Sequence, residues 1–493
     1  MIRIRGVSIV VVLALVAVAC GGRVSEEQVR AEQAEDLLAA GVGFTEGGNE
    51  AAGGRTNGVG PGAAFAESDS VSLGLEGNSS LGFSGDGSAP TGSDPGSVGN
   101  EPGSPPAPAA GNGGATDVGI TETEVVIGNV STLSGPVPGL FRGALVGTQA
   151  WFAYQNSLGG LYGRQFRVES GDDNFDTGTN RSAHRSLKDK VFAFSGSFSL
   201  FDAASVGEMK SVGVVDIGRA LSPARQDYER HYSMVPFGIG WPTTGCQWLK
   251  DRFGDQVIKN MAIFWGNADA ARDNASWQRA ACESVGFEFK YSRQVEATES
   301  NFTADVVQMR RQNIQGFFII YDASGIGRFL ADMESQGYDP PLQYPSPAAY
   351  DSDLVKFAGK AGVEGIIIGQ NMSMFLGEDA VAVPEIVTFN EWVRRIDPNQ
   401  KFDLFALYGW AAGQLLTNAM TAAGPEVTRE KVLAELAKTT SYNASGLHSV
   451  HNVAAKAPSV CEMYMEGTAD GGFRRIFPDT GFYCEGTFHQ YTG

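Results

Sequence analysis

The sequence is short of basic residues, and this deficit limits the partners it can bind. Its 493 residues include 37 Lys and Arg against 56 Asp and Glu, so the formal net charge is −19 at pH 7. A chain this acidic repels nucleic-acid phosphates and anionic membrane surfaces. We therefore expect no nucleic-acid partner and no membrane contact through the folded surface.

Catalytic motifs are missing from the folded part of the sequence. It contains no Gly-x-Ser-x-Gly nucleophile elbow, no Gly-x-x-x-x-Gly-Lys-Ser/Thr phosphate loop, and no Gly-x-Gly-x-x-Gly after a strand. The motifs that usually indicate a hydrolase, an NTPase or a dehydrogenase are therefore absent. The sequence predicts a protein that is not an enzyme, with no catalytic residues and no cofactor.

Metal-binding patterns are equally weak. The two histidines of GLHSVHNV, residues 446–453, have no third ligand at a recognisable spacing. The segment DDNFDTG, residues 172–178, resembles the start of a calcium loop, but Thr177 replaces the required Gly and Ala183 the required Glu. We expect no metal site, and we interpret Asp176 as the N-cap of the helix that follows.

Long hydrophobic runs are also absent from the N-terminus, where the apolar segment 7–19 is shorter than the roughly 20 residues of a membrane-spanning helix. Two arginines precede this segment, a pattern typical of a signal peptide over residues 1–19. The sequence AVACG, residues 17–21, resembles a bacterial lipobox, although Ala17 stands where Leu is usual. The resemblance implies lipidation of Cys20 and attachment to the extracytoplasmic face of the cell membrane. The alternative is an ordinary secretory signal with an incidental cysteine.

Cysteine is scarce, with five residues in the chain. Apart from Cys20 they form an even set, which in an oxidising compartment predicts disulfides. Pairing neighbours along the chain predicts the bonds Cys246–Cys282 and Cys461–Cys484, while two other pairings and free buried thiols remain open. No Cys-x-x-Cys is present, so a redox or zinc role has no support.

Composition divides the chain near residue 117. Residues 20–116 are predicted to be the lipid anchor and a disordered tether rich in Gly, Ser and Pro. From residue 117 apolar strands alternate with amphipathic helices such as 142–160, which predicts an α/β fold with parallel sheets. The predicted strands are 124–130, 165–173, 191–195, 213–217, 260–265, 315–321 and 363–368.

The alternation of predicted strands and helices is interrupted at FGIGWPTTG, residues 237–245. We therefore expect two doubly wound lobes joined by a hinge, with a ligand cleft at the carboxyl ends of their strands. Lobe 1 is predicted to comprise residues 117–240 and about 365–445. Lobe 2 is predicted to comprise 241–364 and about 446–493.

The first part of the folded region resembles the opening of branched-chain amino-acid binding proteins of ABC transporters, which have the type I periplasmic-binding-protein fold. The likeness spans roughly residues 117–440 and weakens towards the C-terminus. The matching positions are Ile127, Gly128, Leu133, Ser134, Gly135, Pro136, Gly147, Asn156, Gly159, Gly160, Gly163, Arg164, Asp172 and Asp173.

This resemblance implies that the loops after two strands of lobe 1 bind the carboxylate of the ligand. It places Ser197 and Ser199 in one loop, and Ala220, Leu221 and Ser222 in the next. The alternative is that these serines satisfy the backbone of their own turns.

Other positions depart from an amino-acid receptor. Leu140 and Ala270 stand where the family has aromatic side chains over the ligand, and Pro347 falls near the acid that pairs with the ammonium group. Burying an unpaired ammonium group costs several kcal/mol. Either Asp322 supplies the charge or the ligand has no amine, and Asp322 also suits the N-cap of the next helix.

The resemblance thus predicts a lipid-anchored, monomeric solute receptor that closes on a small metabolite and delivers it to a membrane permease and ATPase. The ligand would be amino-acid-like, an amide or a small organic acid. A sensor of the same fold and an exported enzyme with an unrecognised site are the alternatives. The candidate ligand contacts are Ser134, Leu140, Phe141, Ser197, Phe198, Ser199, Ala220, Leu221, Ser222, Trp241, Ala270, Asp322, Ala323 and Pro347. Trp241 and Phe198 either cover the ligand or pack in the core.

Overall fold

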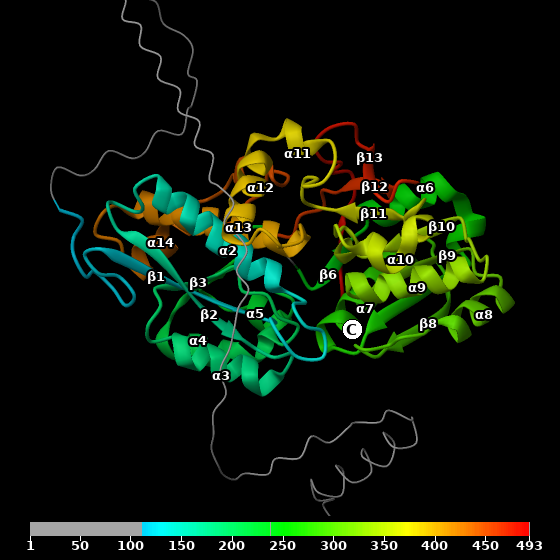
Figure 1. The fold of residues 1–493 in the computed structure, drawn as a ribbon, viewed down its shortest axis with the longest axis horizontal. Coiled ribbons are helices and arrows are strands. Elements are labelled where there is room, and N and C mark those ends of the chain that lie inside the picture. The colour runs from blue at the N-terminus through cyan, green and yellow to red at the C-terminus, as the bar shows by residue number, and fades with distance from the viewer. Residues whose placement is uncertain (1–110, 237, 493) are drawn as a thin grey trace, which may run out of the picture. The chain divides into compact units, whose positions relative to one another are not determined.

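The computed structural model describes residues 111–236 and 238–492. The predicted signal peptide, Cys20 and most of the predicted tether lie outside these residues. In the described part, strands and helices alternate and build two parallel sheets (Figure 1). The predicted α/β fold is confirmed.

The first sheet and the helices packed on it form lobe 1. Its five strands follow the order β2-β1-β3-β4-β5, and every pair is parallel. Every residue of β1 after Glu124 is buried, as expected for a strand covered by helices on both faces. The strands are β1 (Glu124–Ser131), β2 (Gln165–Asp172), β3 (Ala193–Ser195), β4 (Val215–Ile217) and β5 (His231–Tyr232).

The second sheet and its helices form lobe 2. Its order is β10-β9-β7-β8, again all parallel. The strands are β7 (Met261–Gly266), β8 (Phe289–Val295), β9 (Gly316–Ile320) and β10 (Leu342–Pro345). Strands β1, β2, β3, β4, β7 and β9 fall close to predicted strands, because short β-branched and aromatic runs bounded by turn residues are a strong local signal. Strands β5, β8 and β10 were not predicted.

The helices fall into two groups by the sheet on which they lie. With lobe 1 are α2 (Arg142–Ser157), α3 (Thr177–Leu187), η1 (Asp202–Ser205), α4 (Val206–Val212), α5 (Pro223–Gln226), α11 (Asp379–Ala382), α12 (Pro384–Ile396), α13 (Leu404–Ala423), α14 (Arg429–Leu436) and η3 (Ala444–Gly446). With lobe 2 are α6 (Thr244–Ile258), α7 (Asp269–Ser284), α8 (Thr303–Arg311), α9 (Ala323–Ser335), η2 (Pro347–Ala349) and α10 (Leu354–Val363).

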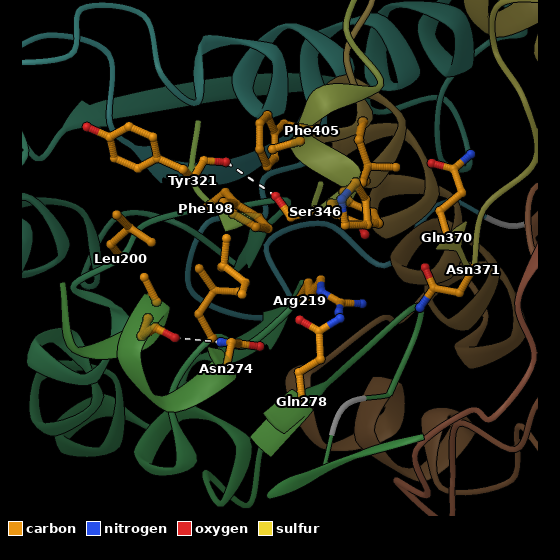
Figure 2. Close-up of a pocket in the computed structure, with 18 of the residues that line it drawn as sticks. Phe198, Leu200, Arg219, Asn274, Gln278, Tyr321, Ser346, Gln370, Asn371 and Phe405 are labelled. Carbon is orange, nitrogen blue, oxygen red and sulfur yellow. Dashed lines mark hydrogen bonds between the residues drawn. The ribbon is translucent and has the colours of Figure 1, made fainter. Parts of the chain in front are cut away.

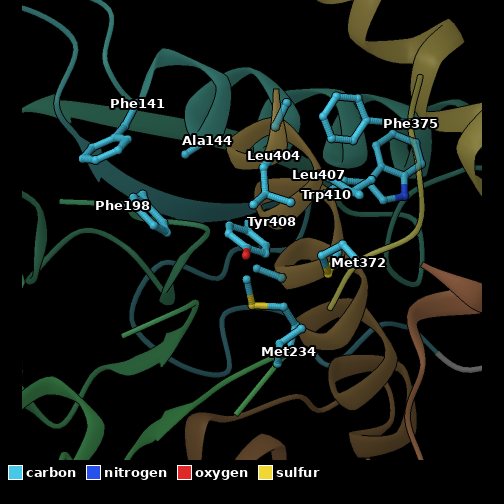
Figure 3. Close-up of a cluster of buried hydrophobic side chains, with 14 of the residues drawn as sticks. Phe141, Ala144, Phe198, Met234, Met372, Phe375, Leu404, Leu407, Tyr408 and Trp410 are labelled. Carbon is cyan, nitrogen blue, oxygen red and sulfur yellow. The ribbon is translucent and has the colours of Figure 1, made fainter. Parts of the chain in front are cut away.

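Helix α13 returns the C-terminal part of the chain to lobe 1, where it runs beside α2 (Figure 1). The two helices approach so closely that a Cβ at Gly147 would lie 1.9 Å from the carbonyl oxygen of Ala406. Glycine is therefore required there, and Gly147 is one of the positions that carry the family resemblance. Figure 3 shows side chains of α13, Tyr408 and Trp410 among them, packed in one buried cluster with Phe198 of the β3 loop.

Two small sheets complete the fold. One has the order β11-β12-β13, with β11 (Ile367–Gln370), β12 (Met463–Gly467) and β13 (Phe473–Phe477), and the other pairs β6 (Gly240–Pro242) with β14 (Phe488–Gln490). The strand predicted at 363–368 is displaced, because Val363 ends α10 and Gly365, at φ 80°, turns the chain before β11. Since β11 contacts β10 of lobe 2, we propose that the return to lobe 1 begins after Gln370 and not near residue 365.

Two local predictions can be checked directly. Both expected disulfides are present, Cys246–Cys282 between α6 and α7, and Cys461–Cys484 between the segment before β12 and the C-terminal segment. Asp176 caps α3, because its side chain accepts a hydrogen bond from the Thr179 backbone N–H at 2.7 Å.

Candidate functional site

A pocket with a volume of about 240 Å³ lies at the carboxyl ends of strands from both sheets (Figure 2). Ligands of open α/β sheets bind in this position, because loops and helix N-termini converge there. The lining residues that directly follow strands are Phe198 and Leu200 after β3, Arg219 and Leu221 after β4, Asn267 after β7, Tyr321 and Asp322 after β9, Ser346 after β10 and Asn371 after β11.

One side of the pocket is aromatic. Phe141 precedes α2, Phe198 follows β3, and Phe405 and Tyr408 come from the first turns of α13. The ring centroid of Phe141 lies 4.7 Å from those of both Phe198 and Phe405, while Phe198 stacks on Tyr408 at 5.9 Å. These four residues and Arg219 are called the lobe-1 wall below.

Arg219 is the one Lys or Arg among the described residues that line the pocket. Its guanidinium carbon lies 5.4 Å from the centroid of the Tyr408 ring, a cation–π arrangement. The side chain is neither fully buried nor exposed. A single cation thus stands in an otherwise apolar wall.

A buried ionic network holds the loops that carry Phe198 and Arg219. Arg225 donates to both carboxylate oxygens of Asp216 at 2.9 Å and to the carbonyl of Ser197 at 3.2 Å. Asp202 accepts from the Leu221 backbone N–H at 2.7 Å. Although burial opposes ionisation, Arg225 and a nearby histidine hold the pKa of Asp216 well below its usual value. The buried hydrogen bonds of Arg225 and Asp202 therefore hold the two loops in place relative to each other.

The facing side of the pocket carries polar groups, all neutral except Asp322, and is called the lobe-2 wall. Its members are Asn267, Asn274, Gln278, Tyr321, Asp322 and Ser346. Ser346 donates to the carbonyl of Tyr321 at 3.3 Å, and Asn274 to the carbonyl of Ala270 at 2.6 Å (Figure 2).

Two carboxyl groups also line the pocket. Asp322 caps α9, accepting from Ser324 and Gly325 N–H at 3.0 and 3.1 Å, and all of these bonds end on Oδ1. Burial raises the pKa of Glu462 to about 7, against the effect of the Tyr464 hydroxyl, which donates to it at 2.8 Å. Each carboxyl is thus engaged within the protein.

The predicted contacts divide into two sets. Leu140, Phe141, Phe198, Leu221, Trp241, Ala270, Asp322 and Pro347 line the pocket. Ser134, Ser197, Ser199, Ala220, Ser222 and Ala323 are not among its lining residues.

The residues outside the lining serve the fold. Ser134 donates to Asp172, Ser199 donates to Asp173, and Ser197 accepts from the backbone N–H of Val130 at 3.0 Å. Ser222 caps α5, while Ala220 and Ala323 are buried.

The reason for this division is side-chain alternation in the two lobe-1 loops. In an extended segment neighbouring side chains point to opposite sides. Phe198 enters the pocket between two serines that turn inward, and Arg219 and Leu221 enter it on either side of Ala220. The predicted contacts included residues from both sides of these loops, and alternation separates those that line the pocket from those that do not.

Sequence reasoning missed Arg219, Phe405, Tyr408, Gln278 and Tyr344. Arg219 directly precedes the predicted residue Ala220. It could have been found by considering that the side chains next to Ala220 in the loop point to the opposite side. Phe405 and Tyr408 gave no such signal, because they lie more than 180 positions beyond Arg219 along the chain and reach the pocket only when α13 returns to lobe 1.

The sequence model of the periplasmic binding protein family matches residues 124–464, well over half of the chain. The chain belongs to the periplasmic binding protein family. Members of this family bind small molecules outside the cytoplasm and work with ABC transporter permeases. The resemblance to Leu/Ile/Val-binding proteins that the sequence suggested is confirmed.

Solved structures show the same fold at low identity. A fatty acid ABC transporter substrate-binding protein from Thermomonospora curvata is 18% identical, with a TM-score of 0.65 over 75% of this chain and 95% of that protein. The branched-chain amino acid transporter substrate-binding protein LivJ from Streptococcus pneumoniae, in complex with isoleucine, is 17% identical, with a TM-score of 0.57 over 72% of this chain and 100% of that protein. A possible leucine/isoleucine/valine-binding protein from Rhodopirellula baltica is 15% identical, with a TM-score of 0.61 over 72% of this chain and 96% of that protein. No curated protein sequence matches the chain.

The described residues offer neither a membrane-spanning helix nor a metal-binding cluster. Within residues 111–236 and 238–492, no helix has both the length and the apolar character to cross a bilayer. The same part of the chain has no cluster of three or more His, Cys, Asp or Glu side chains suited to a metal ion.

Proposed function

We propose that the protein is the solute receptor of an ABC transporter, that it binds one small molecule between its two lobes, and that it hands this molecule to a membrane permease. The observation that carries the proposal is the pocket itself, which takes its lining from the carboxyl ends of strands in both lobes. A ligand that touches both walls favours the closed arrangement of the lobes, and binding then shifts an open/closed equilibrium without chemical change.

The similar structures support this role and leave the ligand open. One is named for fatty acids and another contains isoleucine. The aromatic lobe-1 wall suits an apolar ligand body in either case.

We further propose that the mature chain begins at Cys20, carries lipid there, and acts as a monomer. The lipobox-like sequence at residues 17–21 supports this. Cys20→Ser should move the protein from the membrane fraction into the medium, as followed by immunoblotting. Fractionation identical to that of the parent would rule out the lipid anchor.

The binding function is tested by native mass spectrometry of the Cys20→Ser chain, purified without detergent. We expect a co-purifying small molecule at one per chain. Ala270→Trp should displace it, because Ala270 is 4% exposed and lines the pocket. Ala382→Trp is the matched control, since Ala382 is exposed on α11 away from the pocket. A chain that is always empty and binds nothing from a broad nutrient panel would refute the proposal.

A further inference from the structure

Few charged side chains line the described part of the pocket. Among the described lining residues, Arg219 is the only basic one, and Asp322 and Glu462 are the acidic ones. Asp322 accepts from two backbone N–H groups and the hydroxyl of Ser324, which a helix N-terminus requires. Glu462 accepts from the hydroxyl of Tyr464. Both carboxyls therefore already have structural partners.

The position expected to hold an ammonium group has no charge. Pro347 lines the pocket at the start of η2, and neighbouring Ser346 donates its hydroxyl to the Tyr321 carbonyl. Pro347 supplies no anion for a ligand ammonium group at that position, and the nearby Asp322 carboxylate uses its Oδ1 to accept the hydrogen bonds of the α9 N-terminus.

Arg219 is well placed to recognise an anion. The buried Arg225–Asp216 pair fixes the strand end and loop that carry it, and Tyr408 lies against its guanidinium group. A guanidinium group carries its N–H donors in a fixed planar fork that matches a carboxylate. In Figure 2 the side chains of Arg219 and Gln278, which come from opposite walls, extend towards the same region of the pocket.

The remaining space is apolar. Phe141, Phe198 and Phe405 cover one side, and Trp241 and Ala270 lie among the lining residues of the other. These side chains suit a hydrocarbon body.

We propose that the pocket binds a monocarboxylic acid with an apolar body and no ammonium group, and that Arg219 holds its carboxylate. This inference rests on the proposed binding function and adds the chemical class of the ligand. Gln278 donates a second hydrogen bond from lobe 2, so that the carboxylate links the two lobes.

The test compares head groups on one hydrocarbon chain by titration calorimetry of the Cys20→Ser protein, without detergent because detergents are themselves amphiphiles. The probes are octanoate, octan-1-ol, octylammonium and leucine, with dodecanoate and 3-phenylpropanoate to vary the body. We expect octanoate to bind at least about 10-fold more tightly than octanol. Octylammonium and leucine should bind more weakly than either.

The variants assign the effect to Arg219. Arg219→Gln should weaken octanoate at least about 10-fold and change octanol less than about 2-fold, and Arg219→Lys should recover part of the loss. Arg311→Gln, at an exposed position on α8, is the matched control and should leave both affinities unchanged. Unaltered octanol binding by Arg219→Gln also shows that the variant is folded.

Three results would overturn the inference. They are leucine or octylammonium binding as tightly as octanoate, octanoate affinity that is indifferent to Arg219→Gln, and failure of all three carboxylates to bind at about 1 mM. If the chain still carries a co-purified molecule that no carboxylate displaces, the binding function stands and the carboxylate assignment falls. If the chain is empty as well, both fall.

Discussion

The two walls of the pocket differ in the chemistry of their side chains. The lobe-1 wall presents four aromatic rings and one cation, supported from beneath by the buried Arg225 network. The lobe-2 wall presents carboxamides and hydroxyls at strand ends and along α7, together with the Asp322 carboxylate that caps α9, and several of these groups are already bonded to nearby backbone. Under the proposed function, lobe 1 would provide most of the affinity and the charge selection, and lobe 2 would add hydrogen bonds when the ligand is enclosed.

The largest expected effect comes from the network under the lobe-1 wall. Arg225→Leu leaves buried Asp216 and Asp202 without their cation, and should lower the free energy of unfolding by about 3 to 5 kcal/mol. Arg185→Leu removes an exposed ion pair with Glu208 and should cost no more than about 1 kcal/mol. Urea denaturation measures both. Equal losses would mean that the network does not stabilise this wall.

The aromatic wall is tested at Phe198, by installing the residue type that the family resemblance favours. Phe198→Ser removes the ring contacts with Phe141, Phe405 and Tyr408 and should destabilise the fold by about 3 kcal/mol. Octanoate binding should weaken with it. Phe357→Ser, at a side chain 42% exposed on α10, should change stability by about 0.5 kcal/mol or less. Unaltered octanoate affinity in Phe198→Ser would contradict the proposed role of this wall.

The pH dependence tests how α13 is held in lobe 1. Asp403 caps this helix through the Ala406 N–H, and burial together with Asp351 raises the pKa of Asp403 to about 7 from its ordinary 3.8, against the effect of Lys401. The folded chain retains a proton that the unfolded chain loses, so Asp403 makes the protein less stable as pH rises from about 4 to about 7.

Asp403→Asn keeps a capping side chain and removes this titration. The stability of the variant relative to the parent should increase as pH rises through the same window, by on the order of 4 kcal/mol above pH 7. Urea midpoints at pH 4, 6 and 8 measure the gap. A gap that is constant with pH, or that narrows as pH rises, would exclude this assignment.

The smallest effect is expected in the lobe-2 wall. Gln278→Leu keeps the size of the side chain and removes one neutral donor, so octanoate affinity should fall by about 3- to 10-fold, in keeping with about 1 kcal/mol for a hydrogen bond. Gln256→Leu, at an exposed position on α6, should have no effect on the affinity. A loss larger than that of Arg219→Gln would reverse the roles that we assign to the two walls.

Local signals predicted most of the fold. Most of the predicted strand runs, the Asp176 and Asp322 caps and the pairing of neighbouring cysteines depend on residues close together in the chain. The structure contains the caps, the disulfides and every predicted strand except the one at 363–368, which is displaced to β11. For the site, the predicted contacts from the two lobe-1 loops include side chains from both sides of each loop, of which Phe198 and Leu221 line the pocket. Ser197 and Phe198 differ by one position, and no local property of the sequence distinguishes which of the two points into the cleft.

The sequence by itself determined the alternation of strands and helices, the family, and the loops from which a ligand site is built, because each of these depends on short-range pattern. Only the tertiary structure decided the chemistry of the site. It brought Phe405 and Tyr408 of α13 against Phe198 and Arg219, which are far away in the chain, and it set the register that turns the serines inward. The physical reason is that a pocket is defined by which side chains face one space, and that follows from the packing of distant segments.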